Sequence, residues 1–444
     1  MSQAAKSVRG RGLFTVKSGA LVTVAALVIA AGCTINVTPP SSNENDNVPP
    51  FGNSTDPTNK GAAYVGADAC RQCHAEVADQ HRVHGHSHKL TRVQGEPPSF
   101  PEEGTLAGVP TPPEGFDWSD IAYVIGGYTK KARFIDNNGY ILVTGVTGVP
   151  TQWNLAHPAN GTTPGFVAYE PDAEAEKPYA YSCFYCHTTG ARPQDEDFPE
   201  YQENRPGFVG TWQEPGVQCE ECHGPGGNHF TTVAGEVVID TGAIYTSATG
   251  EDTCGKCHTR GDNPNVIIAK GGYIQHHEQY PELLASGGHA SFGCATCHDP
   301  HVSVAYDRAN AIRNACTDCH ADQNMGKHEG KVFTRGDYTE VLSCESCHMP
   351  FAGKSASSAT AEVVGELGRM GDTRTHIFRI DSSSVTYTDM FTEDLAQVRT
   401  DAEGRAAVTL DFVCLRCHNG IGAFDIEPRF LTDIAANMHF ISEP

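Results

Sequence analysis

The stretch GCATCHDPHVSVAYDRANAIRNACTDCH, residues 293–320, contains the pattern Cys-x-x-Cys-His twice. The pattern occurs eight times along the 444 residues and uses 16 of the 17 cysteines. The cysteine pairs are Cys70 and Cys73, Cys183 and Cys186, Cys219 and Cys222, Cys254 and Cys257, Cys294 and Cys297, Cys316 and Cys319, Cys344 and Cys347, and Cys414 and Cys417. The histidines that follow them directly are His74, His187, His223, His258, His298, His320, His348 and His418. This repeated motif, rather than hydrophobic periodicity, decides the fold.

The spacing of the motif has a chemical reason. Two thiols placed this way add to the two vinyl groups of one haem, and the imidazole that follows binds the iron as proximal ligand. Zinc ribbons and structural disulfides also pair cysteines, but neither requires a histidine directly after every second cysteine. The sequence therefore predicts eight covalently bound haem c groups.

The second axial ligand of each iron must come from the 13 of 21 histidines that lie outside the motifs. Iron held by two imidazoles is closed and suits electron transfer, whereas iron with one imidazole can bind a small substrate. The supply is sufficient for eight closed irons, so counting alone requires no open one. The candidate distal ligands are His86, His229, His277, His289, His301, His328, His376 and His439.

The N-terminal 33 residues predict an exported lipoprotein. Basic residues precede the apolar stretch 19–32, which is too short to span a bilayer and fits a secretory signal peptide. The stretch ends in Ala30-Ala31-Gly32-Cys33, which resembles a bacterial lipobox, so we expect lipidation of Cys33. An ordinary cleaved signal peptide is the alternative. Residues 34–61 contain almost no large apolar side chain and predict a flexible tether.

The remaining chain divides by motif density. We expect an N-terminal haem 1 region with a β-rich insertion (62–182), a six-haem core (183–350), and a C-terminal region with a β-rich segment and haem 8 (351–444). The six-haem core has too few residues to enclose each haem separately, so its haems must pack closely. The fold class expected is a mainly α and irregular multihaem cytochrome c fold with small β-hairpin insertions, its core organised around packed haems.

Strands are expected in the two long gaps between motifs. In the first gap, residues 121–125 are a candidate strand, and residues 132–136 and 140–144 predict a hairpin around Asn137-Asn138-Gly139. In the second gap, the candidate strands are residues 376–380, 385–388 and 406–412.

The formal net charge of −23 argues against binding of nucleic acid, which requires clustered basic side chains. The acidic surface is either a solvated coat or a docking face for a basic redox partner or a mineral. Another cluster is His81, His84 and His88, which share one face of an expected helix. This cluster is either an extra metal site or one haem ligand with solvated neighbours.

With these motifs in view, residues 64–440 resemble multihaem cytochromes of the cytochrome c-554 type. The resemblance rests on His84-Gly85-His86 after the first motif, on residues 216–229, on residues 294–301, on Met349-Pro350 with residues 354–356, and on residues 371–376. It implies electron transfer by stacked haems, mostly with two histidine ligands, and points to His86 as an axial ligand. Relatives with eight haems include enzymes of hydroxylamine, nitrite or tetrathionate, some with a lysine in place of a motif histidine; no such motif occurs in this chain.

Two functions follow from the sequence. The first is an octahaem carrier that moves electrons between redox partner proteins or to an extracellular acceptor, anchored by lipid to the outer membrane on its periplasmic or cell-surface side. The alternative is an oxidoreductase of a small nitrogen or sulfur compound at one open haem. A subunit of a conductive filament is a third possibility, and the sequence leaves the oligomeric state open.

Overall fold

The computed structural model describes residues 54–247, 250–421 and 424–440. The predicted signal peptide, Cys33 and most of the predicted tether lie outside these ranges. Within them, no helix combines the length and the apolar composition that crossing a membrane requires.

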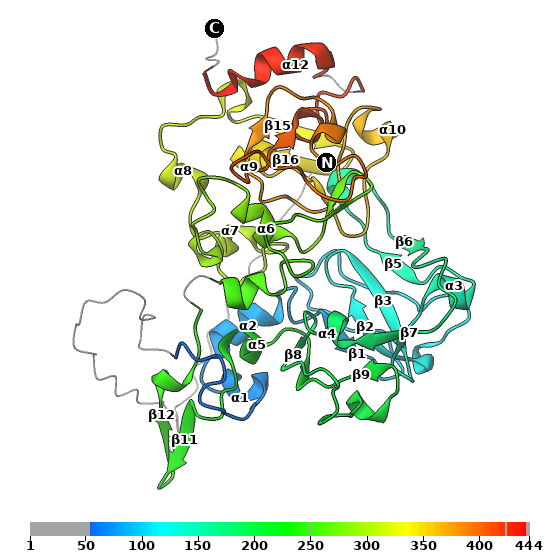
Figure 1. Ribbon diagram of the computed structural model, residues 1–444, viewed down its shortest axis with the longest axis vertical. Coiled ribbons are helices and arrows are strands. Elements are labelled where there is room, and N and C mark those ends of the chain that lie inside the picture. The colour runs from blue at the N-terminus through cyan, green and yellow to red at the C-terminus, as the bar shows by residue number, and fades with distance from the viewer. Residues whose placement is uncertain (1–53, 248–249, 422–423, 441–444) are drawn as a thin grey trace, which may run out of the picture. The chain divides into compact units, whose positions relative to one another are not determined.

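The largest sheet has eight strands, seven from the gap between the first two motifs and one, β9, from after the second motif (Figure 1). Its main path is β1 (Leu90–Arg92), β2 (Ile121–Gly126), β3 (Lys131–Asp136), β4 (Tyr140–Ile141), β7 (Lys177–Ala180) and β9 (Phe208–Val209). Two further strands, β5 (Gln152–Asn154) and β6 (Gly165–Val167), extend from β3. The pairs are antiparallel except β7 with β9. The expected strand at 121–125 and the expected turn at 137–139 are confirmed here, but the expected strand at 140–144 is only the two-residue β4, because a helix begins at Thr144.

This sheet is buried on both faces, which explains why β2 is apolar along nearly its whole length. Tyr123 and Ile135 pack into one hydrophobic cluster with Tyr179, whereas Val124 and Phe134 pack into another on the opposite side. Neighbouring residues on a strand point to opposite faces, so an uninterrupted apolar run fills two cores.

Helices in the described residues are short, and the longest, α2 (Ala75–Arg82) and α12 (Pro428–Ala435), have eight residues. Motif cysteines lie on α1 (Ala67–Arg71), α4 (Tyr181–Phe184), α5 (Cys219–His223), α8 (Cys316–Cys319) and α9 (Cys344–His348), and on single turns at Glu251–Gly255 and Cys294–Thr296. The others are α3 (Thr144–Thr147), α6 (Gln279–Leu284), α7 (Arg308–Ala311), α10 (Ala361–Val364) and α11 (Leu410–Val413).

The expectation of a mainly α fold is wrong. Helices contain 23% and strands 20% of the described residues, and the sheet is curled. The physical reason is twofold: the apolar strands of the insertion build a sheet with two buried faces, and each motif needs only one helical turn.

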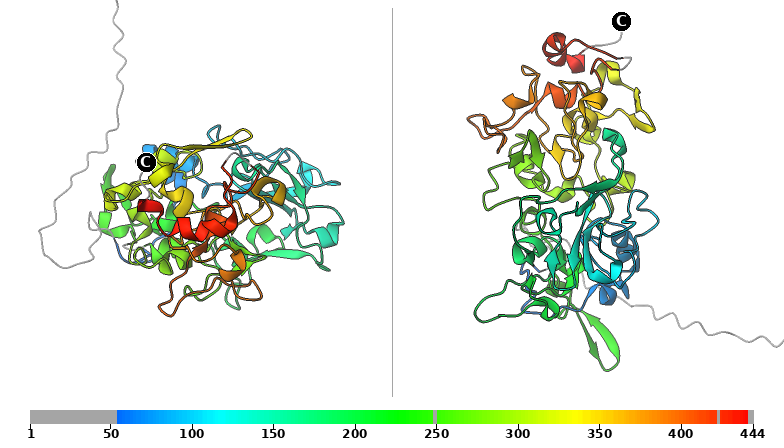
Figure 2. Two further views of the ribbon diagram at one scale, coloured as in Figure 1. Left: turned by 90° about the horizontal axis from the view of Figure 1, so that it is seen from above. Right: turned by 90° about the vertical axis from the view of Figure 1, so that its right-hand side faces the viewer.

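The smaller sheets connect the rest of the chain. They are β8 (Thr188–Thr189) with β10 (Glu214–Pro215), β11 (Phe230–Val233) with β12 (Glu236–Ile239), β13 (Ala269–Lys270) with β14 (Tyr273–Gln275) and β17 (Gly353–Lys354), β15 (Val332–Arg335) with β16 (Tyr338–Val341), and β18 (Ile380–Asp381) with β19 (Val408–Thr409). The β11–β12 hairpin projects away from the neighbouring ribbon (Figures 1 and 2).

The strands expected in the second gap are mostly absent from the described residues. Residues 376–380 contribute only Ile380 to β18, residues 385–388 form no strand, and residues 406–412 form the two-residue β19 before α11 begins. The backbone N–H of His376 donates to the carboxylate of Glu282, so a side chain rather than a neighbouring strand holds this segment. A third hydrophobic cluster fills this part of the chain around Ile274, Phe391 and Phe412.

Candidate functional site

Each motif forms a single helical turn. The backbone N–H of His74 donates to the carbonyl of Cys70, four residues earlier, over 2.9 Å. The same i to i−4 hydrogen bond links His258 to Cys254 and His418 to Cys414. This turn places both thiols and the imidazole on one side of the backbone, as attachment to one porphyrin requires. All 16 motif cysteines are free thiols rather than disulfides.

Six motif imidazoles each face one imidazole from the candidate distal set. The ring centres are 5.8–6.4 Å apart in the pairs His74–His229, His223–His301, His298–His376, His320–His289, His348–His439 and His418–His328. Metal–imidazole bonds of roughly 2 Å on both sides of one iron would separate the ring centres by about 6 Å. The spacing therefore fits an iron between each pair.

The two remaining motif imidazoles differ from the others. His258 faces two candidates, His277 at 5.8 Å and His86 at 6.1 Å between ring centres. His187 is stacked on no other histidine in the described residues. Its aromatic neighbour is Tyr179, whose hydroxyl lies 3.1 Å from His187 Nδ1 and would leave Nε2 free to bind an iron. The structure thus brings together all eight candidate distal histidines with motif imidazoles, but it gives His187 none.

Both cysteines and the histidine of each of the first five motifs, together with Cys316 of the sixth, line one continuous cavity of about 3100 Å³. A pocket for a single small molecule typically measures roughly 300–1,000 Å³, so this space is several times larger. Apolar atoms provide most of its lining. The cavity has the size and the chemistry for several porphyrins side by side.

Two family models match the chain. The family described as cytochrome c554 and c-prime matches residues 166–224, and the doubled CXXCH motif matches residues 282–325. The resemblance to the cytochrome c-554 type is therefore confirmed. The chain is a multihaem c-type cytochrome.

Curated relatives and a solved structure agree with this assignment. The cytochrome is 25% identical over 209 residues to the dissimilatory sulfite reductase MccA of Wolinella succinogenes, covering 37% of this chain and 26% of that protein. It is 27% identical over 194 residues to the multiheme cytochrome MtrA of Shewanella baltica, covering 42% of this chain and 50% of that protein. The chain thus matches half or less of the length of these relatives. The octaheme structure of MccA superimposes with a TM-score of 0.52 at 18% identity, over 86% of this chain and 70% of that one, which shows a shared fold.

Sulfur atoms of different motifs in the cytochrome lie in contact. The side chains of Cys70 and Cys219 interact, so the first and third motifs meet. The same kind of interaction links Cys186 with Cys257, Cys254 with Cys294, and Cys316 with Cys344. Because each sulfur marks the edge of a porphyrin, haems bound at these motifs would meet edge to edge.

Basic side chains surround His187 in the cytochrome. Burial, and next the positive charge of Lys89, lower the pKa of His187 to about 3, and Arg133, Lys131 and Arg260 act in the same direction. All four basic side chains line the same cavity as His187. None of the four has a carboxylate within ion-pair distance in the part of the chain that the structure describes.

These basic side chains are held in place by neutral partners. Lys131 donates to the carbonyl of Ser355. The Nε–H of Arg133 donates to the side-chain oxygen of Gln152 over 2.9 Å. The Nε–H of Arg260 donates to the carbonyl of His276 over 3.0 Å, and its Nη2 lies 3.3 Å from His276 Nε2. None of these hydrogen-bond partners carries a charge, and the carboxylates of Asp372 and Glu170 act on Lys131 and Arg133 only from beyond ion-pair distance.

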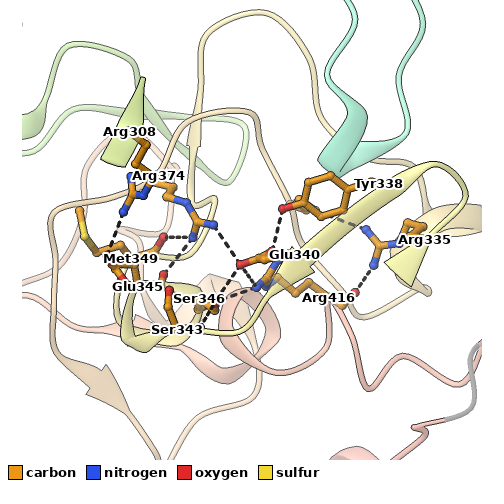
Figure 3. Close-up of polar contacts among 11 residues, drawn as sticks. Arg308, Arg335, Tyr338, Glu340, Ser343, Glu345, Ser346, Met349, Arg374 and Arg416 are labelled. Carbon is orange, nitrogen blue, oxygen red and sulfur yellow. Dashed lines mark hydrogen bonds and ion pairs between the residues drawn. The ribbon is translucent and has the colours of Figure 1, made fainter. Parts of the chain in front are cut away.

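The last two motifs of the cytochrome are linked by a buried ion-pair network (Figure 3). Glu340 on β16 accepts hydrogen bonds from Arg416 at 2.9 and 3.1 Å and from Arg374 at 3.1 Å. It also accepts from the hydroxyls of Ser346 (2.6 Å) and Tyr338 (2.7 Å). Since Ser346 lies inside the seventh motif and Arg416 inside the eighth, one carboxylate fixes both attachment sites relative to each other.

Sequence reasoning missed this network and the basic cluster. The signal for the cluster was present, because Lys131 and Arg133 lie two apart on a strand and so point to the same face. Arg260 comes from a loop more than a hundred residues away, and only the tertiary fold shows that it joins them.

His81, His84 and His88 do not form a metal site: the described residues contain no group of three or more ligating side chains placed to hold an ion.

Proposed function

We propose that this protein is an octahaem oxidoreductase in which seven haems closed by two histidines exchange electrons with one open haem at His187, where a small oxyanion reacts. The observation that carries the proposal is the contrast at His187. It is the one motif imidazole in the described residues without a histidine opposite, and it is the one surrounded by Lys89, Lys131, Arg133 and Arg260.

The sulfur contacts support an order for the electron path. Motif 1 meets motif 3, motif 4 meets motif 5, and motif 6 meets motif 7. Electrostatic interactions between cysteines link motifs 3 and 4, 5 and 6, and 7 and 8. The order 1–3–4–5–6–7–8 follows, with haem 2 attached as a branch at haem 4 through Cys186 and Cys257. A branch suits a site of reaction, because electrons can reach it from either end of the path.

The basic cluster defines the class of substrate. Four basic side chains that form no ion pair favour an anion, and a bound anion would recover the electrostatic free energy lost by burying them. When bound, haem iron supplies the site of electron exchange. The chain's own residues bind and orient the anion, and the ring of His276 lies beside Arg260. The name of the relative MccA makes sulfite the first anion to test, and nitrite the second.

A second candidate is an electron carrier without turnover, which the similarity to MtrA favours. In both cases we propose export, a lipid on Cys33 and docking of redox partners on the acidic surface. The haem-relay function is common to the two candidates, and they differ only in the chemistry at His187.

The experiment is a haem count and low-temperature electron paramagnetic resonance of the purified holoprotein. We expect eight haems per chain, with seven low-spin signals and one high-spin signal. The high-spin signal should change when sulfite or nitrite is added. Turnover of either anion with a reduced dye would follow. Eight low-spin signals that no anion perturbs would exclude the open site and support the electron-carrier function instead.

Anion binding should depend on pH through Lys131. Burial, and next the charge of Arg133, lower the pKa of Lys131 to about 7 in the anion-free protein. Lys131 is protonated and positively charged below that pKa and loses its charge as the pH rises through it. The affinity for sulfite or nitrite should therefore fall above pH 7. Optical titrations between pH 6 and 9 measure this fall, and Lys131→Arg, which stays charged, should flatten the profile. A wild-type profile as flat as that of the arginine variant would contradict the assignment.

A further inference from the structure

The candidate iron ligands differ in what their second ring nitrogen contacts. An imidazole that binds iron through Nε2 carries its proton on Nδ1, and the acceptor of that proton sets the basicity of the ligand. Most Nδ1 partners are neutral oxygens: Tyr245 O for His223, Phe378 O for His348, Asp240 O for His229 and Asn324 O for His439. His258 contacts the amide oxygen of Gln279.

His301 is different. Its Nδ1 lies 3.2 Å from the carboxylate oxygen Oδ1 of Asp299, and the same oxygen accepts the backbone N–H of His301 over 3.0 Å. The second oxygen, Oδ2, accepts from Arg313 at 3.2 Å. In the described residues, no other candidate ligand has a carboxylate within hydrogen-bond distance of its Nδ1.

Asp299 lies between ligands of two haems. It follows His298, the motif imidazole of haem 5, and precedes Pro300-His301, which reaches toward His223 of haem 3. The proline restricts the backbone of this segment. The carboxylate is therefore directed at the haem 3 ligand by a short, stiff connection.

The ligands of haem 5 show the opposite situation. The Nδ1 atoms of His298 and His376 are both buried and have no hydrogen-bond partner. The nearest carboxylate to His376, that of Glu282, lies 3.9 Å away. Neither imidazole gains the added basicity that an anionic acceptor provides.

We propose that Asp299 lowers the reduction potential of haem 3 below that of haem 5, so that electrons move downhill from haem 3 through haem 4 to haem 5. A carboxylate on Nδ1–H strengthens electron donation from the ligand and stabilises ferric over ferrous iron. This inference rests on the proposed pairing of His223 with His301 and of His298 with His376. Asp299 acts through His301 and is a positioning residue for the electron path.

The test is a potentiometric titration of the holoprotein followed by electron paramagnetic resonance, with no anion added. In Asp299→Asn, one low-spin signal should change and its midpoint should shift upward, because a neutral amide replaces the carboxylate. In Arg313→Gln, which removes the cation on Oδ2 but keeps the carboxylate, the same midpoint should shift downward. Asp307→Asn is the matched control, since Asp307 contacts Asn310 and no histidine.

Opposite shifts in the two variants support the inference, because simple damage to the segment would not reverse sign. Unchanged midpoints in Asp299→Asn, or an equal shift in Asp307→Asn, would overturn it. If Asp299→Asn does not load haem, Arg313→Gln decides: a downward shift supports the role of Asp299 and no shift rejects it. Because no substrate is used, these results are independent of whether the haem at His187 reacts with anions.

Discussion

Replacing Glu340 with glutamine should reduce the free energy of unfolding by about 3 kcal/mol, since removal of one partner from a buried ion pair typically destabilises by roughly 3–5 kcal/mol. The side chains of Glu340 and Arg416 are only 9% and 2% exposed. The glutamine variant would leave two guanidinium groups, on Arg374 and Arg416, buried without a counter-charge. Urea unfolding of the holoprotein followed by circular dichroism measures the loss.

The matched control is Glu403→Gln, because Glu403 forms an exposed ion pair with Arg405. Exposed pairs contribute about 0–1 kcal/mol, so this variant should unfold close to the wild type. A Glu340→Gln protein that is as stable as the control would show that the network does not hold motifs 7 and 8 together.

The Glu340 network should also resist acid. Burial raises the pKa of Glu340, but the hydrogen bond and charge of Arg416 outweigh burial and hold the pKa well below its ordinary value. A carboxyl with a lowered pKa contributes stability above its unfolded pKa and loses it only as the pH falls through the folded one. The stability difference between wild type and Glu340→Gln should therefore persist at neutral pH and shrink only in strong acid.

Replacing Arg260 with glutamine should weaken the binding of sulfite or nitrite about 10- to 100-fold, since hydrogen bonds to charged groups contribute roughly 1.5–3 kcal/mol. Arg260 lines the same cavity as His187, and its guanidinium forms no ion pair with a carboxylate in the described residues. Optical titration of the high-spin haem measures the affinity, and the haem count should be unchanged.

Two further variants separate charge from geometry. Arg260→Lys keeps the charge but loses the forked contact with His276, so its affinity should lie between those of wild type and Arg260→Gln. Arg399→Gln removes a charge from an exposed position and should leave the affinity unchanged. If Arg260→Gln and Arg399→Gln lose the same affinity for the anion, Arg260 acts only through the net charge of the protein.

The motif-based part of the site could be predicted from sequence because its chemistry is local. Two thiols and an imidazole within five residues define an attachment site without any tertiary information. The pairing of His74 with His229, or of His348 with His439, joins residues far apart in the chain, so the sequence supplies the candidates but not the partners. The same holds for Glu340, whose partners come from three separate segments.

The predicted fold class was wrong for a related reason. Residues 121–125 predict a strand correctly, but apolar alternation does not reveal that the strands of the insertion join into one curled sheet. In the second gap, the apolar residues of 385–388 and 406–412 pack as turns and a helix into the cluster around Phe391 and Phe412. Short apolar segments suit either state until their neighbours are known.

The cavity lined by the first five motifs and Cys316 has a consequence for biogenesis. A polypeptide cannot keep a mostly apolar hollow of about 3100 Å³ open by itself, because interiors pack densely and voids are destabilising. We expect the newly synthesised chain to stay unfolded until its cysteines have reacted, with each one-turn motif recognised as a local segment. Condensation into the native arrangement would then be the last step of maturation, and omission of a single ligation should expose the whole chain to proteases.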